Sequence, residues 1–111
     1  MTPTPARLGH VERALAELLK FERPADQALS AYFRSYRNLG QQDRAFIAET
    51  AFAVLRRKRS LEAAAGSAAP RDLAIAALVR VFGLSARALD RDADLVARVK
   101  AILLSPKTEW A

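Results

Sequence analysis

The stretch from Gly40 to Arg59 most constrains what this chain can fold into. At an advance of about 100° per residue, a helix over this stretch has apolar side chains on most of its circumference. One side carries Asp43, Ile47, Thr50, Ala51, Val54 and Leu55, and Phe46 and Phe52 widen the apolar surface on either flank. A helix with so little polar surface needs other helices packed around it. We therefore expect a helical core with this segment at its centre.

Length and composition are consistent with one domain. The chain has 111 residues, enough to bury a core without cross-links, and it contains no cysteine. This excludes disulfides, thiolate metal sites and cysteine nucleophiles. The densest apolar run is too short to span a bilayer, and no signal-peptide core follows the first residues. We expect a single domain over residues 1–111 with a flexible leader at 1–5, in a soluble, cytoplasmic protein with no membrane partner.

Apolar residues recur at helical spacing through the rest of the chain, and no segment alternates as a strand would. We expect helices over about residues 6–21, 24–37, 40–59, 70–82 and 95–104. Residues 60–65 either extend the central helix or form a shorter one, and residues 66–69 form a break. The predicted fold class is all-α, a compact bundle of about five to six helices, in which the almost wholly apolar helix over 70–82 is interior.

Positive charge is concentrated in one part of the chain. The net charge is +6, and residues 34–59 carry seven cations against two anions. Residues 1–33 are balanced, and residues 60–111 have an excess of one cation. A basic segment in an otherwise balanced chain is the electrostatic footprint expected for a polyanionic partner such as a nucleic acid.

The basic run of Arg56, Arg57, Lys58 and Arg59 is the strongest functional signal in this segment. Cations at a helix C-terminus complement the helix dipole, which is worth from a few tenths to about 1 kcal/mol each. Four in a row exceed that role, because neighbouring like charges repel and successive side chains point in different directions. Contact with nucleic acid is therefore favoured over a solvated helix end. A nuclear-localisation signal is a further interpretation of the run.

The turn between the second and the central helix is another candidate site. It carries Arg34, Arg37, Asn38, Gln41, Gln42 and Arg44. Arginines and amides on a short loop and a helix N-terminus can hold phosphates and contact exposed base edges, as in the recognition of single-stranded or looped RNA. An ordinary exposed turn is the alternative, and RNA contact gains weight because the turn lies in the basic segment.

Other residues with useful chemistry form no recognisable site. His10, the only histidine, has no cysteine or carboxylate at ligand spacing and is expected at the surface. Tyr32 and Tyr36 are expected in the core rather than stacked on bases. The acidic run over residues 90–94 lacks the glycine and glutamate of a calcium loop, so a helix start is favoured. We expect no catalytic, cofactor or metal site within these 111 residues.

The segment Leu39–Leu61 resembles the central motif of the NusB-like domain that begins the RsmB (Sun/Fmu) family of bacterial 16S rRNA cytosine-5 methyltransferases. The similarity rests on an Asp-Arg pair followed by Phe46, and on a Val-Leu-Arg sequence that ends at Arg56, before further cations. Residues 13–33 also resemble the opening helices of that family, whereas the similarity after Leu61 is weak. The resemblance implies a NusB-like, all-α fold.

In that family, the NusB-like domain precedes a catalytic domain that binds S-adenosylmethionine and methylates cytosine through a cysteine nucleophile. Because this chain has neither a cysteine nor a cofactor loop, the resemblance implies an isolated N-terminal domain that is not itself an enzyme. Residues 106–111 would begin the linker to the catalytic domain of a longer parent enzyme, which would supply the cofactor site.

The resemblance thus implies an accessory domain in rRNA processing, with 16S rRNA and its own C-terminal methyltransferase domain as partners. The residues expected to contact RNA are Arg34, Arg37, Gln41, Gln42, Arg44, Arg56, Arg57, Lys58 and Arg59. Arg44 has a second interpretation, a structural ion pair. Two alternative functions stay open. The domain could be a docking scaffold for the catalytic domain, or a free-standing antitermination factor of the NusB kind that binds RNA with a ribosomal-protein partner.

Overall fold

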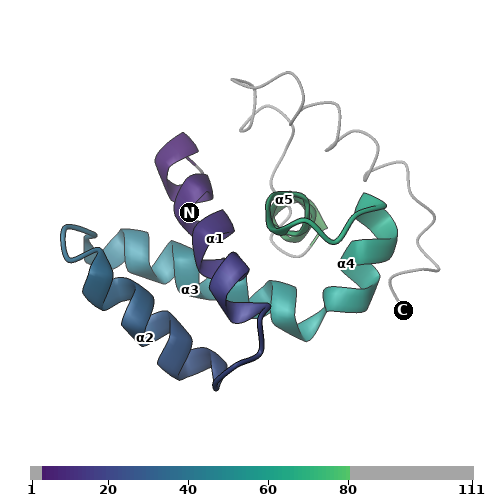
Figure 1. Cartoon of the computed structure of the whole chain (residues 1–111). Helices are drawn as coiled ribbons and strands as arrows, with labels where there is room; N and C mark the ends of the chain where they lie inside the picture. The colour runs from purple at the N-terminus through teal and green to yellow at the C-terminus, as the bar shows by residue number, and fades with distance from the viewer. Residues whose placement is uncertain (1–3, 81–111) are drawn as a thin grey trace.

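A computed structural model describes residues 4–80, which form five helices (Figure 1). They are α1 (Pro5–Leu18), α2 (Ala25–Ser35), α3 (Gln41–Arg56), α4 (Lys58–Ala65) and α5 (Pro70–Arg80). There is no strand among the described residues, so the predicted all-α class is confirmed. Within the same range, no helix is long and apolar enough to cross a membrane. The helix expected over 95–104 lies outside the described residues.

The core lies where α1, α3 and α5 meet. The helix α1 packs against α2, α3 and α5, and α5 also contacts α3 and α4. The largest wholly buried side chains include Leu15, Phe46, Ile47, Leu61, Leu73, Ile75 and Leu78. The prediction of a central helix buried on most of its circumference is confirmed, because α3 leaves only its polar edge and its two ends exposed.

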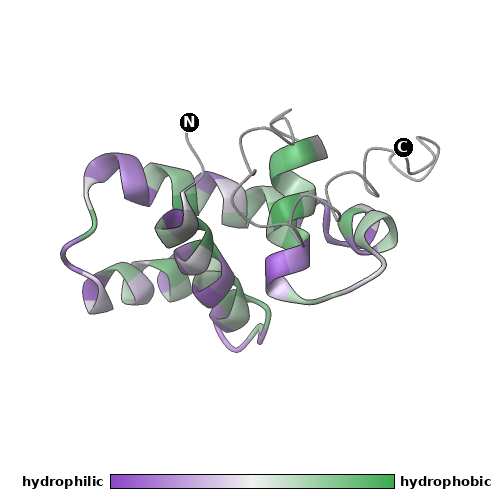
Figure 2. Cartoon of the chain, turned by 90° about the horizontal axis from the view of Figure 1, so that it is seen from above, coloured by the Kyte–Doolittle hydropathy of each residue, from purple (hydrophilic) through white to green (hydrophobic). Residues whose placement is uncertain are grey.

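The prediction that the fifth helix is interior is also confirmed. Every residue from Leu73 to Val79 is buried, and Figure 2 shows this part of α5 as hydrophobic after a hydrophilic first turn. In Figure 1, α5 is seen end-on between α1 and α4. The predicted break after α4 occurs at Gly66, whose φ of 66° lies in the left-handed region that glycine adopts without strain.

The central helix ends earlier than predicted. It was expected to continue to Arg59, but α3 ends at Arg56, and Arg57 leaves the helical conformation with φ −124° and ψ 26°. A separate helix, α4, then begins at Lys58, which decides between the two alternatives for residues 60–65. The change of direction at Arg57 allows Leu61 to be wholly buried in the core, and this burial favours the break.

The first helix also ends early. It was expected to reach residue 21, but α1 ends at Leu18, and Phe21 has a φ of 53°. A residue in this left-handed region cannot continue a right-handed helix, and glycine usually occupies it. The chain turns there and enters α2 through Pro24, which is the N-cap residue.

Candidate nucleic-acid interface

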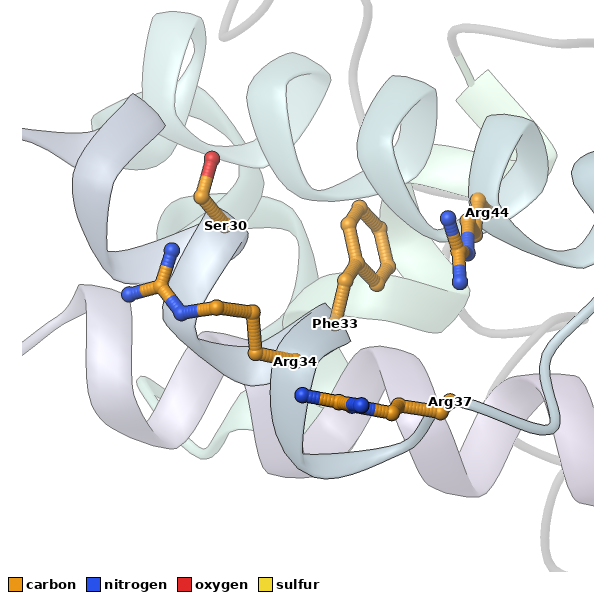
Figure 3. A pocket seen from close by; sticks show the side chains of 5 residues that line it. All are labelled: Ser30, Phe33, Arg34, Arg37 and Arg44. Carbon is orange, nitrogen blue, oxygen red and sulfur yellow. The ribbon is translucent and has the colours of Figure 1, made fainter.

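Three arginines from two helices and the turn between them line one open hollow, which we call the α2–α3 depression (Figure 3). Arg34 lies on α2, Arg37 on the turn and Arg44 on α3, and Ser30 and Phe33 complete the lining. The depression has a volume of about 510 Å³. All three arginines are exposed, and none forms an ion pair with another described residue.

The position of Arg44 follows from the way α3 begins. Gly40 is the N-cap, and its N–H donates to Asp43 Oδ2 at 3.2 Å. This cap fixes the first turn of α3, which carries Arg44. The Arg44 guanidinium carbon lies 5.8 Å from the centre of the Phe33 ring, within the range of a cation–π interaction. The aromatic ring therefore orients this guanidinium within the depression.

The structural ion pair in this region belongs to Asp43 instead of Arg44. Arg7 Nε donates to Asp43 Oδ1 at 2.6 Å, which joins the start of α1 to the start of α3. The hydrogen bond from Arg7, followed by that from the Gly40 N–H, lowers the pKa of Asp43. Asp43 is therefore ionised at neutral pH and holds the turn in place, whereas Arg44 faces the depression.

Gln41 and Gln42 are exposed in the first turn of α3. Neither is among the described residues that line the α2–α3 depression. They lie next to it in sequence, since Arg44 follows Gln42 by two positions. The two amides can therefore contact a ligand that extends beyond the depression, but they do not help to form it.

The basic run lies at the other end of α3. Arg44 and Arg56 are separated by twelve positions, about 18 Å at 1.5 Å per residue. Arg56, Arg57 and Arg59 are exposed, whereas Lys58 pairs with Glu62 on the next turn of α4. The break between α3 and α4 falls within the run. The structure thus places the predicted residues in two separate groups rather than one patch.

A cluster of rings between α1 and α2 was not predicted as a unit. The Tyr32 hydroxyl lies 2.6 Å from His10 Nδ1, and the Tyr32 and Tyr36 rings are stacked with centres 4.6 Å apart. The expectation that His10 is a surface residue is wrong, because the two tyrosines pack against it and leave it half-buried. The expectation that Tyr32 and Tyr36 belong to the core is confirmed for buried Tyr32, and Tyr36 packs against that core.

Tyr32 and Arg13 both contact the same ring nitrogen of His10. Arg13 Nη2 lies 3.3 Å from His10 Nδ1, and a guanidinium group can only donate. Nδ1 can therefore accept from Arg13 only when it carries no proton. Burial is the main cause of the lowered pKa of His10. The positive charge of Arg13 lowers this pKa further, whereas the negative charge of Asp43 raises it. The i, i+4 spacing of Tyr32 and Tyr36 was the one signal for this cluster in the sequence.

Among residues 4–80, no group of three or more histidine and acidic side chains could hold a metal ion. No family model matches the chain, and neither a curated protein nor a solved structure matches it. The NusB-like resemblance therefore stays a prediction. The candidate interface rests on its own geometry and charge.

Proposed function

We propose that this domain binds single-stranded or looped RNA at the surface where α2 meets α3. The observation that carries the proposal is that Arg34, Arg37 and Arg44 all line the α2–α3 depression. Guanidinium groups bind phosphates through two parallel hydrogen bonds, and these three have no carboxylate partner among the described residues. The charge excess of residues 34–59 adds long-range attraction for a polyanion.

The shape of the site favours a polymer over a small molecule. Small-molecule pockets usually enclose most of the ligand surface, whereas the α2–α3 depression is open. Arg44, backed by the Phe33 ring, has the arrangement in which a guanidinium plane stacks on an unpaired base. A nucleic acid with splayed-out bases offers both the phosphates and the base faces that these side chains can bind.

The sequence resemblance supports a more specific form of this proposal. In that form, the chain is the accessory domain of a cytoplasmic, S-adenosylmethionine-dependent 16S rRNA cytosine-5 methyltransferase and holds its substrate. The cofactor and the catalytic cysteine would then belong to a separate domain. A reading frame that continues beyond residue 111 into a cofactor-binding domain would support this form, and an immediate stop codon would contradict it.

RNA binding is tested with the full 111-residue chain and a fluorescein-labelled single-stranded oligouridine. We expect the affinity of the wild-type chain to fall between about 50 and 200 mM salt, because phosphate contacts release counterions. Changing Arg34, Arg37 and Arg44 together to Gln should reduce the slope of log affinity against log salt concentration by about 2, at about 0.7 for each lost contact.

The matched variant carries Arg56→Gln, Arg57→Gln and Arg59→Gln, which remove the same charge from the other end of α3. A much smaller loss of affinity in this variant would support the α2–α3 depression as the site. Equal losses in the two variants would show that the total charge matters and the depression does not. No binding by a folded wild-type chain would overturn the proposal and favour the docking role.

A further inference from the structure

A second groove lies on the opposite side of α2, between α2 and α1, and we call it the α1–α2 groove. Arg13 and Arg23 line it, Tyr36 lies in the same wall, and three alanines contribute small side chains. Small side chains allow a ligand to approach the backbone of both helices closely. The groove has a volume of about 420 Å³, slightly less than that of the α2–α3 depression.

The charge of this groove is positive. Glu17 is the one acidic side chain in its described lining, and Lys20 pairs with it at 3.2 Å. Arg23 is exposed and has no ion pair with a described residue. The Arg13 guanidinium carbon lies 5.8 Å from the Tyr36 ring centre, which matches the pairing of Arg44 with Phe33 across α2. Each side of α2 thus holds an arginine that is oriented by an aromatic ring.

Phe21 stands next to this groove in sequence, two residues before Arg23. It is the one large apolar side chain exposed among the described residues, with 66% of its surface accessible. It is also the one described non-glycine residue with a positive φ, 53°. A bulky residue in this conformation is strained, and the core gains nothing from the exposed ring. The positive φ ends α1, but that turn does not require an aromatic side chain, so the exposed ring points to a role outside folding.

We propose that the corner between α1 and α2 is a second contact for the same RNA strand, in which Phe21 stacks on a base and Arg13 and Arg23 hold adjoining phosphates. This inference rests on the proposed function. An aromatic platform beside a cationic groove is how proteins hold single strands without sequence preference. A helix is about 10 to 12 Å across, so one strand can cross α2 and reach both grooves.

An exposed phenylalanine can also anchor in the apolar pocket of another protein. RNA is favoured here because the neighbouring groove carries two arginines and no large aliphatic side chain in its described lining. The outward face of α2 between the two grooves carries Ser30, Arg34 and Ser35, all exposed. Ser30 and Arg34 can donate hydrogen bonds to phosphates, whereas the Ser35 hydroxyl already donates to the Ala31 carbonyl oxygen. None of the three is acidic.

The test combines RNA affinity with thermal stability. Asparagine tolerates the left-handed conformation, so Phe21→Asn should melt at or above the wild-type temperature. The same variant should bind the labelled oligouridine about 5- to 150-fold more weakly, the range expected for the loss of one stacked base. Phe21→Tyr keeps a ring and should bind within about twofold of the wild type, since stacking tolerates either ring.

Arg23→Gln gives a separate test of the groove. It should lower the slope of log affinity against log salt concentration by about 0.7, the contribution of one phosphate contact on a single strand. Arg59→Gln is the charge-matched control, because Arg59 is exposed on α4 and lines neither groove in the described structure. Equal effects of these two variants would contradict the contact at Arg23.

Failure of this inference can be distinguished from failure of the proposed function. If Phe21→Asn binds RNA like the wild type, while the variant in Arg34, Arg37 and Arg44 loses affinity, the second contact is wrong and the proposed function stands. If the folded wild-type chain binds no RNA, the proposed function fails and this inference fails with it.

Discussion

The α2–α3 depression and the basic run differ in how the spacing of their arginines along the sequence relates to the position of those arginines in the structure. Arg34, Arg37 and Arg44 are spread over eleven positions, yet a turn and a helix start bring them around one hollow. Arg56 and Arg59 lie within four adjacent positions, yet a helix break falls between them. Density of charge along a chain therefore does not by itself produce a binding site. A site needs backbone geometry that places several cations around one hollow.

Of the substitutions that test this comparison, Leu61→Ala should have the largest effect, which is on the free energy of unfolding. Leu61 is wholly buried and packs α4 against the core. It lies just after the helix break that falls within the basic run. Its loss should lower the free energy of unfolding by about 2 to 5 kcal/mol, the usual cost of such a cavity. Urea denaturation would measure this loss, with half-buried Leu55→Ala as the control of smaller effect.

The same variant tests whether the two regions are independent. Since Leu61 is distant in sequence from the α2–α3 depression and does not line it, the folded Leu61→Ala chain should keep wild-type RNA affinity. A loss of affinity under conditions where the chain is folded would show that the basic run and the direction of α4 contribute to binding. The contrast between the two regions would then fail.

A smaller effect is expected from Arg44→Lys. Lysine keeps the charge but lacks the planar group that lies over Phe33, so affinity for single-stranded RNA should fall by about two- to fivefold. The salt dependence should not change, because the number of cations is the same. Arg59→Lys should have no measurable effect, and equal losses in the two variants would contradict the role of the aromatic ring.

The smallest expected effect is the contribution of His10 to the pH dependence of stability. His10 lies on the opposite side of α2 from the depression. Because the pKa of His10 in the folded chain is below its ordinary value of 6.5, the unfolded chain binds the proton more readily. The free energy of unfolding should therefore decrease as the pH falls below about 6.5 toward the folded pKa. Arg13 favours this dependence and Asp43 opposes it.

Urea denaturation at several pH values, with His10→Gln as the control, measures this dependence. Glutamine does not titrate, so the variant should lose the part of the pH dependence that occurs near neutrality. An identical pH profile in the two proteins would show that His10 takes up its proton equally well in the folded and unfolded chains. Asp43, whose pKa is lowered by its hydrogen bonds, affects stability only at lower pH and should do so equally in both proteins.

The predictions that succeeded depend on local periodicity. The burial of Ile47 and Val54 follows from helical spacing, and the interior position of α5 follows from its composition. The grouping of Arg34, Arg37 and Arg44 could be proposed from the turn, but the shape of the depression depends on the packing of α2 beside α3. Sequence spacing alone could not separate this group from the basic run.

The predictions that failed depend on contacts between distant residues. The end of α3 at Arg56 reflects the burial of Leu61, which requires the rest of the core. His10 was placed at the surface because its partner Tyr32 lies 22 positions away, beyond any local pattern. The left-handed conformation of Phe21 had no glycine to signal it. In each case a tertiary contact or an unusual backbone angle overrode the local preference.

The central place of α5 has a consequence for synthesis of the protein. It is the last of the described helices in the chain, yet it contacts α1, α3 and α4. A nascent chain that ends before Pro70 therefore lacks the helix that covers the apolar faces of the other three. Such a chain would expose core surface and be a target for chaperones. Folding of this domain on the ribosome must wait until α5 has emerged.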